Sequence, residues 1–357
     1  FKRLTFRKIL LVAQYFFSIV FIITIILIYR QMIFMVNADM GFEREKVYNI
    51  HYEDNDRDVI KDVLSRIPEV QSITFGSHVP GVGSVRSTEI KLGERDEESI
   101  ESNHFDVDDN YLSTMRIKLV AGNDFPKNLS TESESMVLIS EMAVEKYNFE
   151  SAIDALGKNI IADDTINLRV QGVFQNYKYC ALFLPERPLI LRYRPNYTNY
   201  VVLNLQTTNL PETVEKLKSS WKEVDSEHEL DGILLDSEIR DFYTYFEDIL
   251  YMVGYTTFLA IIIASMGLYG MASYSIRTRT KEVGIRKVYG ADTGIIVKLI
   301  SKSFIKLLLL AIIIGAPLAY LLNNAWLGFL ASHVSFGAGT VISGVMVVLI
   351  IGLLSIS

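Results

Sequence analysis

The chain has 357 residues, a formal net charge of −7 and a single cysteine. One cysteine excludes an internal disulfide, so a domain of this chain must be stabilised by its own core. The charge is unevenly spread: residues 31–249 carry 22 Lys/Arg and 40 Asp/Glu, whereas residues 307–357 carry neither kind.

Residues 9–29 form the first of four long apolar stretches and contain no charged side chain. A helix over this stretch rises about 31 Å, which matches a hydrocarbon core of about 30 Å. We expect a retained transmembrane helix after a basic cytoplasmic flank at residues 1–8. A cleaved signal peptide is the alternative, but the run is too long and no small-residue cleavage site follows Tyr29.

Residues 30–249 follow as a domain outside the membrane. Short runs between Gly, Pro, Asn and Asp predict strands at 47–52, 72–76, 88–92, 117–120, 136–139, 168–174, 188–193 and 200–205. Apolar spacing predicts helices at 57–66, 140–147 and 211–224, and a stalk at 237–249. The irregular order favours an α+β fold. We expect two lobes, with a middle lobe at residues 100–185 inserted into a lobe built from the flanking segments.

Three further apolar stretches predict three more transmembrane helices, at residues 250–276, 307–322 and 340–357. Residues 277–306 between two of them carry eight Lys/Arg and two acidic residues, and residues 323–339 form a short uncharged loop. Because basic segments stay in the cytoplasm, we expect the acidic domain on the opposite side. A soluble protein with buried helices is the alternative, but such helices rarely exceed about 14 apolar residues.

The basic segment contains a short amphipathic pattern. Ile285, Val288 and Tyr289 lie at helical spacing, Gly290 favours a helix end, and Asp292 favours the start of a new helix. The pattern predicts a short helix at the membrane surface, and a loop that only fixes topology is the alternative.

Three lysines recur every four residues on the helix that follows: Lys298, Lys302 and Lys306. Their long side chains can reach lipid headgroups while neighbouring apolar residues enter the lipid boundary. We therefore expect these lysines at the membrane surface.

Residues 279–291, RTKEVGIRKVYGA, resemble the signature of the FtsX/MacB-like permeases of ABC transporters, [KR]-[KR]-E-[IV]-G-[IV]-[RK]-[RK]-x-x-G-A, with Thr280 replacing one basic residue. Other strings similar to this family, especially to its Bacteroidetes-type members, lie at 29–31, 39–42, 78–83, 107–125 and 170–191. The resemblance implies a four-helix permease in the inner membrane. It also implies a cytoplasmic N-terminus and a MacB-like periplasmic domain between the first two helices.

The resemblance further implies that the basic segment is a coupling helix that docks on an ATPase subunit. The residues carried over for this contact are Lys281, Glu282, Val283, Gly284, Ile285, Arg286, Lys287, Val288, Tyr289, Gly290 and Ala291. The implied partners are a cytoplasmic ABC ATPase, a second permease half or a second copy, the lipid bilayer, and a periplasmic partner or substrate. No nucleic acid and no cofactor is expected.

We therefore expect a permease that couples ATP hydrolysis in a separate subunit to movement of the periplasmic domain. This mechanotransmission would drive export or extraction of a substrate at the outer face. The chain begins with Phe1 and resembles the C-terminal four-helix half of a longer protein. The alternatives are a membrane-anchored extracellular sensor or binding protein, and a membrane-bound enzyme.

Catalytic and metal-binding patterns are missing from the sequence. It contains no G-x-x-x-x-G-K-[ST] and no H-E-x-x-H string. We interpret His78 and His104 as surface residues and Cys180 as a packed side chain. We interpret the acidic residues as solvated surface rather than a calcium site: Glu97, Glu98, Asp106, Asp108 and Asp109. No charged residue lies inside the four apolar stretches, so ion transport through them is not expected.

Overall fold

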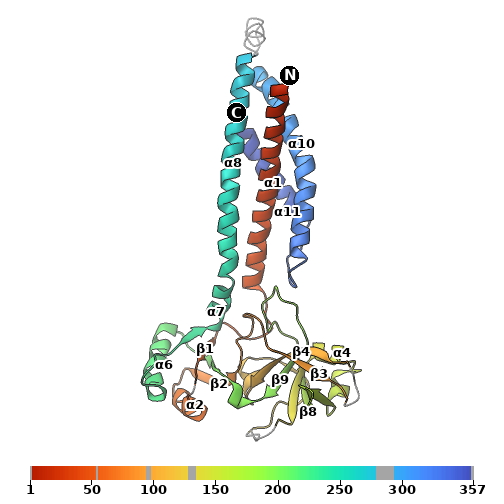
Figure 1. The fold of residues 1–357 in the computed structure, drawn as a ribbon. Coiled ribbons are helices and arrows are strands. Elements are labelled where there is room, and N and C mark those ends of the chain that lie inside the picture. Colours follow the sequence, from red (N-terminus) through yellow and green to blue (C-terminus); the bar gives the residue numbers. More distant parts are fainter. Residues whose placement is uncertain (1, 54, 94–97, 128–133, 279–292, 355–357) are drawn as a thin grey trace. The chain divides into compact units, whose positions relative to one another are not determined.

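The computed structural model describes the chain except for residues 1, 54, 94–97, 128–133, 279–292 and 355–357. The chain divides into two compact units (Figure 1). The helical unit contains Phe1–Asn37 and Tyr243–Ser357, and the α+β unit contains Ala38–Phe242.

The helical unit is built on its first helix. Its long helices are α1 (Lys2–Asn37), α8 (Thr244–Thr278), α10 (Thr293–Leu327) and α11 (Ala338–Leu354). Helix α1 packs against each of the other three, and Ile19 and Ile23 at its centre are fully buried among them. Because α1 packs against all three of the other long helices, it forms the axis of the bundle.

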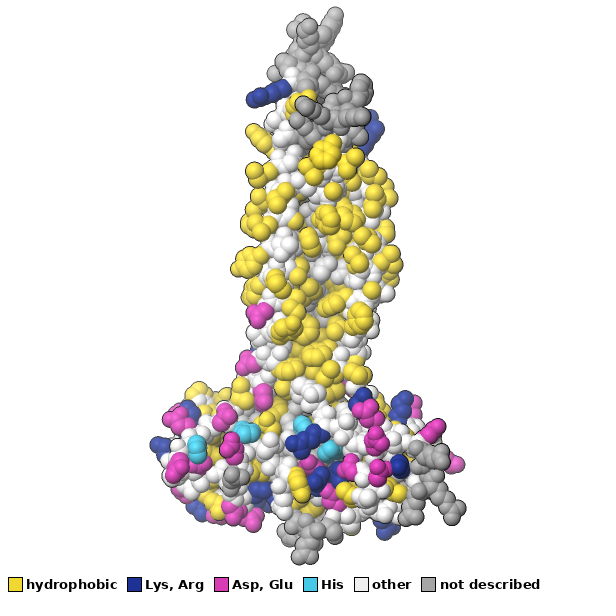
Figure 2. Space-filling view, in the orientation of Figure 1, with side chains coloured by type: hydrophobic (Ala, Val, Ile, Leu, Met, Phe, Trp, Pro, Cys, Tyr) yellow, Lys and Arg dark blue, Asp and Glu magenta, His cyan; other side chains and the backbone are white. Residues whose placement is uncertain are grey.

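Three helical segments are long and apolar enough to cross a membrane: Lys8–Asn37, Leu235–Gly267 and Phe304–Leu327. The apolar part of the last helix, Ala338–Gly352, is shorter. Three of the four predicted spans are thus confirmed by length and composition, and the fourth stays a prediction. Figure 2 shows hydrophobic side chains over most of the visible side of the helical unit, whereas charged side chains cover the α+β unit.

The α+β unit contains an 11-stranded sheet in its described residues. The strands are β1 (Val47–His51), β2 (Val70–Gly76), β3 (Ser87–Lys91), β4 (Ile100–Val107), β5 (Leu119–Gly122), β6 (Met136–Ser140), β7 (Asn159–Ala162), β8 (Ile166–Phe174), β9 (Leu189–Tyr193), β10 (Tyr200–Leu205) and β11 (Gly232–Leu234). The helices are α2 (Arg57–Ser65), α3 (Tyr111–Thr114), α4 (Glu141–Lys146), α5 (Ala152–Ala155), α6 (Leu210–Val224) and α7 (Leu235–Phe242), with a 3-10 turn at Pro195–Tyr197. The predicted α+β class is confirmed.

One part of this unit is a flank sheet, in which β11, β1, β10 and β2 pair antiparallel in that order. Helices α2 and α6 pack against the sheet and against each other. Asp56 caps α2 by accepting a hydrogen bond from the backbone of Asp58, and α6 has a proline in its first turn. Leu217 and Trp221 of α6 are buried against the sheet.

The other part is a closed ring of strands, inserted in sequence between β2 and β10. The ring runs β4, β3, β7, β8, β6, β9 and closes because β9 pairs in parallel with β4. Alternate strand residues such as Ile160 and Leu168 are fully buried in one apolar cluster with α4. Asn167 and Arg169, which face the other way on β8, are exposed, so the apolar cluster fills the interior of the ring.

Candidate functional site

The predicted ATPase-docking residues 281–291 lie outside the described part of the chain. The structure does describe the helices on either side of them, because α8 ends at Thr278 and α10 begins at Thr293. Both helices pack along α1. The two helices that flank the predicted docking residues therefore share one packing partner.

The predicted membrane-surface lysines lie on α10. Lys302 and Lys306 are exposed and one helical turn apart, while Phe304 and Leu308 beside them are buried in the bundle. Lys298 lies one turn earlier on the same helix. Helix α10 therefore presents cations next to the apolar side that packs on the bundle.

Polar side chains fix the connection between α10 and α11 to α1. Gln31 is fully buried; its side-chain nitrogen donates to the carbonyl of Ser332 at 3.0 Å, and its oxygen accepts from the backbone of Val334 at 2.8 Å. Arg30 donates to the hydroxyl of Thr340 at the start of α11. In an apolar environment such paired polar groups hold neighbouring helices in register.

Small residues let the helices approach α1 closely. A Cβ atom at Gly344 of α11 would lie 2.5 Å from Ile23, and one at Gly267 of α8 would lie 2.5 Å from the side-chain oxygen of Gln14. A side chain at Gly344 would displace the buried Ile23, and one at Gly267 would require the Gln14 side chain to move. Close approach at small residues is the packing that membrane helices commonly use.

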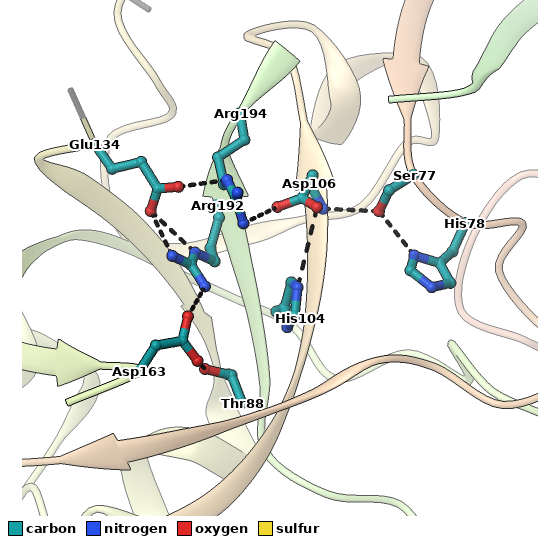
Figure 3. A network of polar contacts seen from close by, with 9 residues as sticks. All are labelled: Ser77, His78, Thr88, His104, Asp106, Glu134, Asp163, Arg192 and Arg194. Carbon is teal, nitrogen blue, oxygen red and sulfur yellow. Dashed lines mark hydrogen bonds and ion pairs between the residues drawn. The ribbon is translucent and has the colours of Figure 1, made fainter. Parts of the chain in front are cut away.

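The α+β unit contains a charged network at one end of the ring (Figure 3). Arg192 of β9 is 1% exposed. Its guanidinium donates to Glu134 at 2.8 and 3.0 Å and to Asp163 at 2.7 Å. Asp163 also accepts from the Thr88 hydroxyl at 2.6 Å. Burial acts against the ionised form of Asp163, but the hydrogen bonds from Thr88 and Arg192 lower its pKa overall.

Asp106 of β4 extends this network towards the flank sheet. Its side chain is 0% exposed, and the ionisable groups beside it are Arg194 at 3.5 Å and His104 at 4.0 Å. Neither carboxylate oxygen has a hydrogen-bond partner among the described residues. Burial raises the pKa of Asp106 to about 6 and lowers the pKa of His104 to about 4. The backbone of Asp106 donates to Ser77, which follows β2 of the flank sheet.

These positions correct two interpretations made from the sequence. Asp106 and Asp108 are buried rather than solvated, because they lie at the end of β4 where this strand of the ring pairs with β2 of the flank sheet. His104 is also buried, and His78 stacks on Phe105 with the ring centroids 5.2 Å apart. Among the described residues, no group of three His, Cys, Asp or Glu is placed to hold a metal ion. Cys180 is packed, as expected, and burial raises its pKa to about 11.

Sequence reasoning missed this network. Its members come from separate strands and loops, and Arg192 and Glu134 are 58 positions apart in the chain. The one available signal was Arg192 in the otherwise mostly apolar strand β9, since an arginine in a strand core requires acidic partners.

Comparison with known proteins identifies the C-terminal part of the chain. Residues 255–357 match the family described as FtsX-like permease C-terminal. This confirms the resemblance to FtsX-like permeases, and the match includes residues 281–291, which the sequence predicts to dock on an ATPase. No curated protein matches the chain.

Several solved structures are similar to this chain. They include the periplasmic region of MacB from Actinobacillus actinomycetemcomitans, with 13% identity, a TM-score of 0.42, and coverage of 58% of this chain and 96% of that one. The extracellular domain of the noncanonic ABC-type transporter YknZ from Gram-positive bacteria has 14% identity, a TM-score of 0.37, and coverage of 51% and 94%. A domain of a putative permease from Porphyromonas gingivalis has 15% identity, a TM-score of 0.39, and coverage of 53% and 88%.

Proposed function

Because residues 255–357 form an FtsX-like permease domain, we propose that the chain is the membrane subunit of an ABC-type transporter or mechanotransmission complex. A separate cytoplasmic ATPase docks on residues 281–291, and its nucleotide-driven closure displaces this segment. The family match is the observation that carries the proposal, because it covers the proposed docking segment, all of α10 and residues 255–278 of α8. The chain works with a second copy or a second permease half, since such machines use paired membrane subunits.

The packing of the helical unit supports this mechanism. Helices α8 and α10 both contact α1. A helix transmits displacement because its backbone hydrogen bonds are internal, and α10 lacks one of them at Pro317. Gly267 of α8 and Gly315 of α10 bring these two helices into close contact with α1, so a push on α8 or α10 also moves α1. Helices α1 and α8 continue directly into the two ends of the α+β unit.

The lysines of α10 support a docking segment at the inner membrane surface. Lys302 and Lys306 lie within the anionic headgroup layer, with Lys298 one turn closer to the docking segment. The acidic α+β unit lies in the periplasm, where it handles a substrate for export or extraction. The fourth span is α11, whose 17 residues rise about 26 Å and cross a slightly thinned bilayer.

Co-purification with the ATPase tests the docking. In the intact complex, the double variant Glu282→Lys and Gly284→Leu reverses one charge of the signature and replaces one of its glycines with a large side chain. We expect it to lose the ATPase while still fractionating with the membrane. Thr280→Lys is the matched control, because it restores the basic residue of the family pattern and should retain the ATPase. Undiminished co-purification with the double variant would argue against docking at this segment.

A further inference from the structure

Two segments tie the α+β unit to the membrane helices. Residues 38–46 continue from α1 into β1, and α7 leads through Tyr243 into α8. Because the chain is continuous, a displacement of α1 or α8 reaches the α+β unit through these two tethers. Their contacts within the α+β unit therefore determine where such a displacement enters it.

The first tether docks on the loop between β8 and β9. The carbonyl of Met40, which is 1% exposed, accepts a hydrogen bond from the backbone of Lys178 at 2.8 Å. A Cβ atom at Gly41 would lie 3.2 Å from the Cβ of Tyr177. The ring of Phe42 packs edge-on against Tyr177 with centroids 5.8 Å apart. The backbone and side chains of this tether are thus both held by one loop.

The second tether docks beside the first. The Cδ1 atom of Ile239 in α7 lies 3.2 Å from where a Cβ of Gly81 would be, and Ile239 is 1% exposed. Phe242 at the end of α7 stacks on Phe183 of the β8–β9 loop, with centroids 6.1 Å apart and planes within 9°. The same loop therefore receives both tethers.

Gly81 is the residue at which these contacts converge. The Phe42 ring lies 3.6 Å and Ile239 lies 3.2 Å from its Cβ position, and its backbone donates to the carbonyl of Tyr179 at 3.0 Å. Gly81 has a φ of +83°, which a side chain rarely adopts. We call Phe42, Gly81, Tyr179 and Ile239 the Gly81 junction.

The junction is attached firmly to the ring. The hydroxyl of Tyr179 donates to the carbonyl of Arg187 at 2.8 Å and accepts from the side chain of Asn103 on β4 at 3.0 Å. Gly81 itself lies in the segment between β2 of the flank sheet and β3 of the ring. The junction thus contacts both tethers, the ring, and the connection to the flank sheet.

We propose that the Gly81 junction is the mechanical joint through which movement of α1 and α8 enters the α+β unit. The proposal rests on the proposed function, because that function supplies the ATP-driven movement. Both tethers are packed against Gly81, whose positive φ few other residues can adopt. Packed segments pass on a displacement directly, whereas a flexible linker must first be extended, so these contacts favour a joint. The joint moves the ring relative to the flank sheet, because Gly81 lies where the chain passes from one to the other.

Gly81→Val tests the joint in the full-length protein, reconstituted in lipid nanodiscs with its ATPase. The new side chain conflicts with the positive φ and with Phe42 and Ile239, so hydrogen exchange at Lys178 should rise by about tenfold. Gly83→Val is the matched control: Gly83 also has a positive φ, of +66°, but no atom lies within 4 Å of its Cβ position.

The decisive measurement is the change in hydrogen exchange of the α+β unit on adding ATP. We expect this change in the wild type and in Gly83→Val, and its loss in Gly81→Val while the ATPase still co-purifies. Persistence of the full change in Gly81→Val overturns the joint and leaves the proposed function intact. If the ATPase never binds, or nucleotide changes nothing in the wild type, the proposed function fails and the joint fails with it.

A second variant covers the case in which Gly81→Val does not fold, shown by rapid exchange throughout β8. Ile239→Ala removes the contact of the second tether without backbone strain. It should weaken the ATP-dependent change while leaving exchange in β8 as in the wild type. A full ATP-dependent change in Ile239→Ala would rule out the joint.

Discussion

At the scale of single residues, Asp106 places an ionisable carboxylate in the buried interior of the α+β unit. Its carboxylate is fully buried, and the ionisable groups that act on it or lie beside it are Arg194, Arg192, Glu134, Arg86 and His104. Burial raises the pKa of Asp106 to about 6, because it outweighs the three arginines, which favour the ionised form. A residue of this kind makes the stability of strand β4 depend on pH.

The sign of this dependence follows from proton linkage. Between pH 3.8 and about 6 the folded protein keeps a proton on Asp106 that the unfolded chain has released. The contribution of this group to stability therefore falls as pH rises through that window, and it stays low above it. The lowered pKa of His104 has the opposite effect on stability. Between pH 6.5 and about 4 the unfolded chain binds a proton that the folded protein does not, so the contribution of His104 to stability falls as pH falls. A variant of Asp106 alone is therefore needed to separate the two groups.

We predict that Asp106→Asn gains stability relative to the wild type as pH rises. The free energy of unfolding of the variant minus that of the wild type should be larger by about 2 kcal/mol at pH 7.5 than at pH 4.5. At pH 7.5 the wild type buries an ionised carboxylate and the variant does not. Hydrogen exchange of the β4 amides in the full-length protein measures this difference, with α6 amides as an internal reference. A difference between the two proteins that does not vary with pH would show that Asp106 does not titrate in this window.

The packing of α11 on α1 gives a prediction at the scale of elements. A Cβ atom at Gly344 would lie 2.5 Å from Ile23, whereas no atom lies within 4 Å of the Cβ position of Gly339 on the same helix. Gly344→Leu should therefore destabilise the bundle by about 1–3 kcal/mol through overpacking, and Gly339→Leu by less than about 0.5 kcal/mol. Unfolding in mixed micelles by added sodium dodecyl sulfate measures both. Equal effects of the two variants would contradict this account of the interface.

Elements were predictable where one physical rule dominates. Uncharged runs long enough for a bilayer predicted α1, α8 and α10, and apolar runs between turn residues predicted most strands, including β8 and β10. Strand β4 was missed because its sequence, IESNHFDV, is mostly polar. It is a strand because the ring closes on it, with β3 on one side and β9 on the other. Pairing between distant segments is invisible to local patterns.

The candidate site was predictable to a smaller extent. Its family signature could be read directly from residues 279–291, because the motif is continuous in sequence. The Gly81 junction could not be derived, although residues 39–42, 78–83 and 170–191 were recognised as similar to the family. These strings are far apart in the chain, and only the fold shows that they meet around Gly81.

At the scale of the whole molecule, charge rather than packing determines orientation. Residues 31–249 carry 40 Asp/Glu against 22 Lys/Arg, whereas residues 277–306 carry eight Lys/Arg and two acids. A basic segment resists translocation across the membrane, and acidic residues contribute little to this choice. The basic segment should therefore stay in the cytoplasm while the α+β unit is exported, whatever contacts the folded protein later makes.

Labelling of single cysteines with a membrane-impermeant maleimide tests this orientation. Ile153 on α5 is 76% exposed, so Ile153→Cys should be labelled in intact spheroplasts. Glu282→Cys in the basic segment should be labelled only after the membrane is permeabilised. The native Cys180 is 4% exposed and serves as a built-in control, because a buried thiol with a raised pKa reacts slowly. Labelling of Glu282→Cys from outside would reverse the topology, and the ATPase would then have no access to the segment on which it is proposed to dock.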